Sequence, residues 1–284
     1  MNKIKENRLI SFITILIIYI IAGVIGVITY NQLKYDWWIN LLIADVVSTI
    51  VTFIFSLIFK NASVYDPYWS VQPIVIIYLI AIGKQMTIGK ILVLLAISYW
   101  GIRLTLNWGY TFKGLNHQDW RYTMLHEQTR KFYPIINFVG IHMVPTLIVY
   151  ACTIPAAYMI IFSNEINIIT IIGFIISIGA ATLQLISDIQ MQKYRKNRNG
   201  NFIRTGLWKY SRHPNYLGEI LMWWGIAIMS FSVFNDKIYL LVGALLNTLL
   251  FLFVSIPMAD KRQSKKEGFE TYKKETRMLF PIKK

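Results

Sequence analysis

The chain has 284 residues, of which 55% are hydrophobic, with a mean hydropathy of +0.47 and a formal net charge of +15 at pH 7. This composition is typical of a membrane protein, and it argues against a soluble nucleic-acid-binding protein despite the large positive charge. The single cysteine, Cys152, excludes an internal disulfide and a multi-cysteine zinc or iron–sulfur site. The four histidines show no ligand-like pairing, so no metal is expected.

Apolar stretches follow one another along the chain and are the expected membrane-spanning helices. A spanning helix needs about 20 apolar residues, so the third stretch is short and is expected to be tilted or partly re-entrant. Pro145 and Pro155 are expected to kink the fifth. The first is too long for the core of a cleavable signal peptide, so it is expected to remain as a helix. In chain order the stretches are Leu9–Tyr30, Trp38–Phe59, Ser70–Ile82, Lys90–Tyr110, Pro134–Phe162, Ile166–Asp188, Asn215–Phe234 and Ile238–Met258.

The predicted fold class is therefore all-α, a polytopic transmembrane helical bundle of about seven or eight spans. If the N-terminus is cytosolic, 24 of the 29 basic residues fall in cytosolic segments and four in outside loops. This bias predicts that both termini are cytosolic. The two most basic segments, Gln190–His213 and Ala259–Lys284, then share that face and flank the last two helices. We expect one domain, residues 1–284, in a bacterial plasma membrane or, in a eukaryote, the endoplasmic reticulum.

An acid among aromatic residues marks the break after the second stretch, in the sequence DPYWS. Asp66 lies beside Tyr65, Tyr68 and Trp69. An acid in such surroundings can have a raised pKa and serve as a proton donor. The alternative is an Asp-Pro turn within an aromatic belt at the membrane surface.

A polar stripe runs along the fourth stretch, because Tyr99, Trp100, Arg103 and Asn107 are spaced at helical intervals. An arginine this deep in an apolar segment requires an acidic partner or a bound anion. Asp45, in the second stretch, is one such partner.

The sixth stretch ends in LQLISDIQMQKYRKNRNG, where Gln184, Asp188, Met191 and Arg195 form one helical stripe. A polar stripe at the end of a membrane helix faces protein or water rather than lipid. Asp188 is expected either to pair with Arg195 or to hold a hydroxyl or amide group of a ligand.

The stretch from Arg204 to Gly225, RTGLWKYSRHPNYLGEILMWWG, begins as a basic, aromatic segment and continues into an apolar helix. Pro214 suits the first helical turn, and Asn215 and Glu219 share one face. Donor groups therefore gather at a positive helix end, an arrangement that suits an anionic ligand. They are Arg204, Tyr210, Arg212 and His213.

Two structural alternatives stay open here. Glu219 could pair with Arg212 or with a basic residue of the tail, and His213 could cap the helix. The chain has no glycine-rich nucleotide loop of a known type, so a nucleotide would be held by side chains and helix ends.

The sequence GLWKYSRHPNYLGEILMWWG, the helix end SD…YRKNRNG before it and the tail IP…DKR…Y…LFP resemble the DUF1295 branch of the steroid 5-alpha-reductase superfamily. The resemblance covers about Gln184 to Pro281, and DPYWS and the run from Arg103 to Trp108 also look like this branch. It implies a membrane reductase that binds NADPH in its C-terminal half, residues 135–284, and a hydrophobic, steroid-like or lipid substrate in residues 1–134. Hydride then goes to an activated carbon–carbon double bond.

Residue roles follow from this resemblance. Asp66 falls near the position of the acid that assists catalysis, and Tyr99 or Trp100 near that of the tyrosine. The residues implied for the cofactor are Gln184, Asp188, Arg195, Arg204, Tyr210, Arg212, His213, Asn215, Tyr216, Glu219 and Arg262.

Two other functions fit the same pattern. Membrane methyltransferases similar to isoprenylcysteine carboxyl methyltransferase share the RHPxY…E pattern and bind S-adenosylmethionine at a similar helix end. The longer helix from Gln184 and the pair Trp223–Trp224 favour the reductase. The third reading is a lipid binder without catalytic activity.

Overall fold

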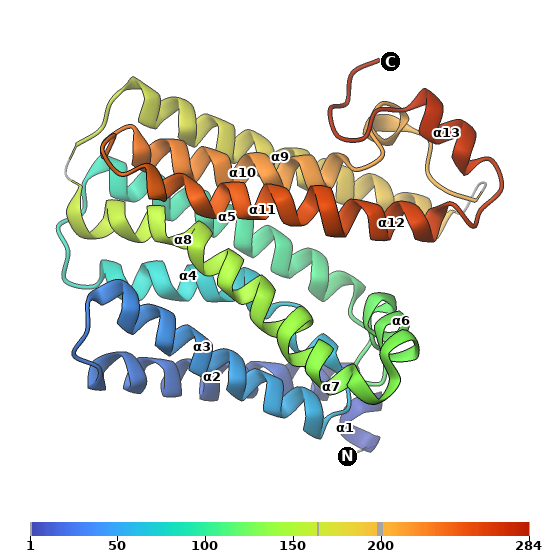
Figure 1. Ribbon diagram of the computed structural model, residues 1–284, viewed down its shortest axis with the longest axis horizontal. Helices are drawn as coiled ribbons and strands as arrows, with labels where there is room; N and C mark the ends of the chain where they lie inside the picture. Colours follow the sequence, from blue (N-terminus) through green and yellow to red (C-terminus); the bar gives the residue numbers. More distant parts are fainter. Residues whose placement is uncertain (1, 164, 198–200, 284) are drawn as a thin grey trace. The chain divides into compact units, whose positions relative to one another are not determined.

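The computed structural model describes residues 2–163, 165–197 and 201–283. In these ranges the regular structure is helical, and no strand occurs apart from an isolated bridge between Ser211 and Arg277 (Figure 1). The predicted all-α fold class is confirmed.

The bounds of the helices follow the apolar pattern closely. The α-helices are α1 (Asn2–Glu6), α2 (Arg8–Gln32), α3 (Trp37–Ile58), α4 (Tyr68–Ala81), α5 (Ile88–Thr111), α6 (Trp120–Thr129), α7 (Tyr133–Ile136), α8 (Val144–Phe162), α9 (Ile168–Lys196), α10 (Pro214–Phe231), α11 (Val242–Leu250), α12 (Ile256–Gln263) and α13 (Phe269–Glu275). Between them lie 3₁₀ turns at Ala62–Tyr65, Arg130–Phe132, Gly206–Lys209 and Ile238–Leu241, and π-helical stretches at Asn137–Met143 and Phe251–Ser255.

Six helical segments of the described chain are long and apolar enough to cross a membrane, which places the protein among integral membrane proteins. Their outward side chains suit contact with lipid, since Leu16 and Ile20 of α2 are 60% and 56% exposed. Every expected stretch coincides with a helix, and α4, with 14 residues, is as short as predicted. The number of crossings and the side of the termini stay predictions. The six segments are Arg8–Gln32, Trp37–Ile58, Ile88–Thr111, Trp120–Phe162, Ile168–Lys196 and Ile238–Gln263.

The chain forms two compact units, and each draws on two stretches of sequence. The first contains residues 1–76 and 104–151, and the second contains residues 77–103 and 152–284. Tyr99 and Trp100, expected with the substrate, thus belong to the same unit as the residues expected at the cofactor, whereas Asp66 belongs to the first unit.

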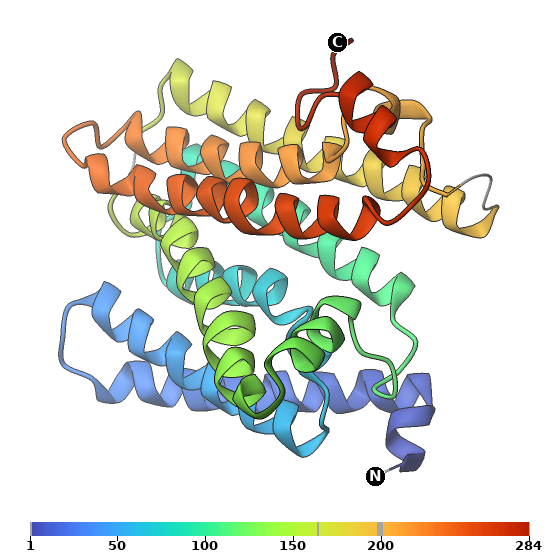
Figure 2. The same cartoon turned by 45° about the vertical axis from the view of Figure 1, so that its right-hand side comes forward.

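In the first unit, α2 and α3 lie side by side (Figures 1 and 2). Asn7 caps α2 by accepting a hydrogen bond from the backbone of Ile10 at 3.0 Å. The buried face of α3 is polar and carries Asp45, Thr49, Thr52 and Ser56. Such a face within an apolar helix needs polar partners inside the protein.

In the second unit, α9, α10 and α11 lie side by side, with α13 near the C-terminal end of α9 (Figure 2). The antiparallel helices α9 and α10 approach closely because their facing positions are small. A side chain at Gly225 would lie 2.6 Å from the backbone oxygen of Gly173, and one at Gly173 would lie 2.9 Å from the backbone nitrogen of Met229. Small residues at such crossings allow membrane helices to pack by close contact.

Both π-helical stretches end just before a proline. Asn137–Met143 precedes Pro145, and Phe251–Ser255 precedes Pro257. Proline lacks a backbone donor and its ring collides with the carbonyl four residues earlier, so a locally wider turn accommodates it. Pro155, by contrast, lies inside α8, which continues to Phe162.

Candidate functional site

Glu219 is the centre of a buried polar cluster in the second unit. Its carboxylate accepts hydrogen bonds from Trp100 Nε1 at 2.9 Å and Gln184 Nε2 at 2.8 Å on one oxygen, and from Trp223 Nε1 at 2.9 Å on the other. Glu219 is 5% exposed. Donors from α5, α9 and α10 therefore hold the acid, and its predicted burial is confirmed.

Arg103 extends this cluster. Its guanidinium pairs with Asp188 at 2.8 Å and also donates to Gln184 Oε1. Gln184 thus links the arginine to Glu219. The expectation that Arg103 requires an acid is confirmed, but that acid is Asp188. Asp45 belongs to the first unit, where it accepts a hydrogen bond from Tyr68.

Asp188 forms its ion pair with Arg103, so Arg195 is not its partner within hydrogen-bond distance. The side chain of Arg195 is exposed. The alternative pairing of Glu219 with Arg212 is also wrong, because Arg212 contacts Asp260 at 3.1 Å.

The start of α10 is fastened to the tail through Asp260 of α12. One carboxylate oxygen of Asp260 accepts from Arg212, and the other lies 2.9 Å from His213 Nε2. Arg212 also donates to the backbone oxygen of Thr276 at 2.8 Å. His213 precedes α10 but makes no side-chain capping bond; its ring stacks on Tyr216, with centroids 5.2 Å apart. The tail thus fixes the segment from which α10 begins.

Asn215 lies on the first turn of α10, one turn before Glu219. Pro214 occupies the first helical position, as predicted. Asn215 Oδ1 is buried and has no hydrogen-bond partner among the described residues. A buried amide oxygen without a donor is uncommon, so this atom remains an unused acceptor.

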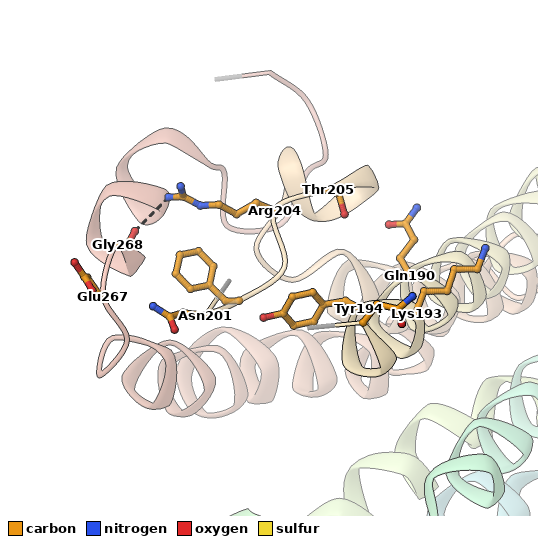
Figure 3. Close-up of a pocket in the computed structure, with 10 residues that line it drawn as sticks. Gln190, Lys193, Tyr194, Asn201, Arg204, Thr205, Glu267 and Gly268 are labelled. Atoms are coloured by element: carbon orange, nitrogen blue, oxygen red, sulfur yellow. Dashed lines mark hydrogen bonds between the residues drawn. The ribbon is translucent and has the colours of Figure 1, made fainter. Parts of the chain in front are cut away.

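A pocket of about 470 Å³ lies at the C-terminal end of α9 (Figure 3). Arg204 reaches across it to the backbone oxygen of Gly268 at 3.2 Å, and its guanidinium lies 5.0 Å from the ring of Phe202 and 5.5 Å from that of Tyr272. Burial raises the pKa of Tyr272 to about 12, so its hydroxyl stays neutral. The pocket is lined by Gln190, Lys193, Tyr194, Asn197, Asn201, Phe202, Arg204, Thr205, Glu267 and Gly268.

Other residues expected at the cofactor lie apart from these contacts. Tyr210 is 38% exposed and lies beside Lys209. Arg262 of α12 is exposed. Neither lines the pocket.

In the first unit, Asp66 accepts a hydrogen bond from the hydroxyl of Tyr122 at 2.7 Å. Burial raises the pKa of Asp66 to about 6, and the charge of Arg121 opposes that rise. The acid thus has a tyrosine partner, but it is Tyr122 of α6. The hydroxyl of Tyr99 contacts Thr182 at 3.1 Å in the second unit.

A family model described as "Protein of unknown function (DUF1295)" matches residues 52–276. The chain belongs to the DUF1295 family. An uncharacterized protein of Schizosaccharomyces pombe is 25% identical in an alignment 217 residues long, which covers 65% of this chain and 63% of that relative. The chain therefore matches less than two thirds of that relative's length. No solved structure gives a significant match.

The DUF1295 match begins after Asp45 and includes Asp66, the Glu219 cluster and the fastening on Asp260. In this DUF1295 protein, sequence reasoning missed three partners. Asp260 was signalled only as the first of four acids in the basic tail, and nothing in the spacing signalled Tyr122. The residues of the pair of Asp45 with Tyr68 lie on separate helices, α3 and α4.

Proposed function

We propose that this DUF1295 protein is a membrane-embedded, NADPH-dependent reductase of a carbon–carbon double bond in a hydrophobic, steroid-like or lipid substrate. The observation that carries the proposal is the unpartnered side-chain oxygen of Asn215, which is buried one helical turn from the hydrogen-bonded carboxylate of Glu219. The resemblance of the sequence to the steroid 5-alpha-reductase superfamily supports the same assignment.

The second unit offers cations for the phosphates of this cofactor and a hydrogen-bond acceptor for its nicotinamide. Lys193 and Arg204 would hold phosphates at the pocket, since both are cationic and the hydrogen bond of Arg204 to Gly268 uses only part of the donor capacity of its guanidinium. Asn215 Oδ1 would accept a hydrogen bond from the carboxamide of the nicotinamide. When bound, NADPH supplies the hydride, and the protein supplies orientation and excludes water.

Glu219 acts in this proposal as a positioning residue. Both of its oxygens already accept hydrogen bonds, so it fixes the rings of Trp100 and Trp223 and the amide of Gln184. Arg103 and Asp188 then hold the far end of Gln184 and keep the cluster rigid. A rigid wall of this kind orients a ligand with little loss of entropy on binding.

Reduction of a double bond also requires a proton. The first unit holds two acid–tyrosine pairs that could deliver it, Asp66 with Tyr122 and Asp45 with Tyr68. A carboxyl group kept protonated by burial can donate to the carbon or oxygen that gains negative charge as hydride arrives.

We expect NADPH to stabilise the purified protein and S-adenosylmethionine to leave its melting temperature unchanged. At a concentration 100 times the dissociation constant, the gain is about 2.7 kcal/mol. Asn215→Ala should keep the melting temperature of the free protein, because its oxygen has no partner to lose, and should weaken NADPH binding about tenfold. Differential scanning fluorimetry in detergent measures both.

Stabilisation by S-adenosylmethionine alone would instead support the methyltransferase. Stabilisation by neither compound would support the lipid binder. An Asn215→Ala protein that binds NADPH as tightly as wild type would remove the assigned carboxamide contact.

We expect Asp66→Asn to lower turnover about 100-fold or more while NADPH binding is kept, because the amide cannot donate an acidic proton. The pKa of about 6 means that the donor form is lost as pH rises above about 6, so the rate should fall there. The rate of NADPH oxidation with a panel of hydrophobic enones measures this. Asp45→Asn in parallel shows which pair supplies the proton.

Stability gives a test of Asp66 that needs no substrate. Because its folded-state pKa lies above the ordinary value of 3.8, the folded protein binds more protons than the unfolded chain between these values. The contribution of Asp66 to stability is therefore full below about pH 4 and is lost as pH rises through about 6. Asp66→Asn should remove that slope from the melting temperature, and an unchanged slope would contradict the raised pKa of Asp66.

A further inference from the structure

The interior of the first unit holds a second polar network, separate from the cluster around Glu219. Tyr68 donates to Asp45 Oδ1 at 3.1 Å, and the side chain of Thr49 lies beside the Tyr68 hydroxyl. Thr49 Oγ1 lies 3.0 Å from Thr146 Oγ1, which lies 2.7 Å from the hydroxyl of Tyr65. All five residues are more than nine-tenths buried. Segments far apart in the sequence thus place a line of hydroxyl groups that leads to one carboxylate.

This network has the composition of a proton path. Each of its hydroxyl groups both donates and accepts, so each link can reverse its direction. When Asp45 is ionised, every hydroxyl can point along the chain towards it, and the oxygen of Tyr65 is then left free to accept a hydrogen. Burial raises the pKa of Tyr65, so this residue passes protons as a neutral hydroxyl.

Both ends of the network carry unused acceptors. Asp45 Oδ2 and His142 Nε2 are buried and have no hydrogen-bond partner in the described parts of the chain. The ring of His142 lies beside that of Tyr65, with centroids 4.7 Å apart. His142 Nδ1 lies 2.9 Å from the backbone oxygen of Asn137 and must be its donor, which leaves Nε2 as a lone-pair acceptor.

His142 owes this position to the π-helical stretch that ends at Met143. Such stretches often occur at functional sites because the wide turn changes which side chains face inward. Buried acceptors without donors are rare in folded proteins. Two of them at opposite ends of this line of hydroxyl groups indicate places where protons enter and leave.

We propose that Tyr65, Thr146, Thr49 and Tyr68 form a buried proton relay that leads from the His142 end to Asp45. A protonated water at the His142 end gives a proton to the oxygen of Tyr65 and becomes neutral water, Tyr65 passes its own hydrogen to Thr146, and so on to Asp45. At each hydroxyl one O–H bond breaks and one forms. One proton therefore enters, one protonates the carboxylate, and no hydroxyl is left charged.

The use of this relay follows from the proposed function. Each hydride that a reductase delivers to a double bond must be matched by a proton, and an acid inside the first unit needs a route by which it regains that proton after every turnover. The relay gives Asp45 this route. Its use in reduction rests on the proposed function, whereas its existence does not.

The test follows hydrogen exchange at Asp45 without NADPH or substrate. Protein in lipid nanodiscs is moved from H₂O to D₂O, and infrared spectra record the C=O stretch of the protonated carboxyl that is missing from Asp45→Asn. We expect Thr146→Val, which keeps the side-chain volume and removes the hydroxyl, to slow the exchange about tenfold or more. Thr146→Ser should restore it.

The matched control is Thr52→Val on the same face of α3. Thr52 is also fully buried, but it donates only to the backbone oxygen of Ser48 and is outside the relay. In the Thr52→Val protein, the carboxyl of Asp45 should exchange its hydrogen at the wild-type rate. If Thr146→Val fails to fold, Thr49→Val breaks the neighbouring link and gives the same expected result.

Equal exchange rates in wild type and in the folded valine variant would overturn the relay, as would the absence of a protonated Asp45 band at every pH the protein tolerates. Because the measurement needs no turnover, the relay can stand if the protein proves not to be a reductase. Conversely, NADPH binding can stand if the relay fails.

Discussion

Glu219→Ala is expected to lower the free energy of unfolding by about 3–6 kcal/mol. The change leaves the donors of Trp100, Gln184 and Trp223 buried without an acceptor, and each such group costs about 1–3 kcal/mol. Gln184 then loses one of its two anchors, so the stabilisation by NADPH that the proposed function implies should also disappear. Unfolding followed by tryptophan fluorescence measures the first effect directly, because two of the freed donors are indoles.

Glu219→Gln is the matched control. It keeps the volume and one oxygen for Trp100 and Gln184, but its amide nitrogen faces the donor of Trp223. We therefore expect a smaller loss, about 1–3 kcal/mol. An alanine variant as stable as wild type would show that these donors find other partners and that Glu219 does not organise the cluster.

Gly225→Ala is expected to cost about 3 kcal/mol, at the upper end of the range for overpacking. The added carbon would press on Ser177 Oγ and lie 2.6 Å from the backbone oxygen of Gly173 and 2.8 Å from the backbone nitrogen of Ser177. A side chain can rotate away, but backbone atoms cannot, so α9 and α10 would have to separate. Thermal unfolding and the yield of folded protein in detergent measure the effect.

Gly179→Ala provides the control on α9. A carbon added at this position meets nothing within 4 Å. Because alanine favours a helix by up to about 1 kcal/mol over glycine, this variant should be as stable as wild type or more stable. A Gly225→Ala protein with the same melting temperature would contradict the close contact between the helices.

Apolar length alone predicted the long helices of this protein, because the cost of exposing backbone groups to lipid leaves few other choices. The same physics predicted that Arg103 needs an acid and that Glu219 is buried. Helical spacing also put Asn215 and Glu219 on one face of α10 correctly. These features depend on local sequence or on a single residue's solvation.

The identity of long-range partners could not be predicted in this way. Nothing in the spacing distinguishes Asp188 from Asp45 as the partner of Arg103, or Asp260 from Glu219 as the partner of Arg212. Tyr122 and Asp66 are far apart in the sequence and meet only because the chain turns between them. Such pairs depend on packing, which periodicity does not encode.

The contacts of Arg212 and His213 with the tail have a consequence for biogenesis. Arg212 and His213 emerge from the ribosome well before Asp260, and the backbone oxygen of Thr276 comes later still. While the chain is being synthesised, α10 can insert, but the segment before it lacks the carboxylate of Asp260 that later binds Arg212 and His213. Residues translated after α10 therefore complete the contacts at its start, and a nascent polypeptide released before Asp260 would lack that carboxylate even with α9 and α10 in place.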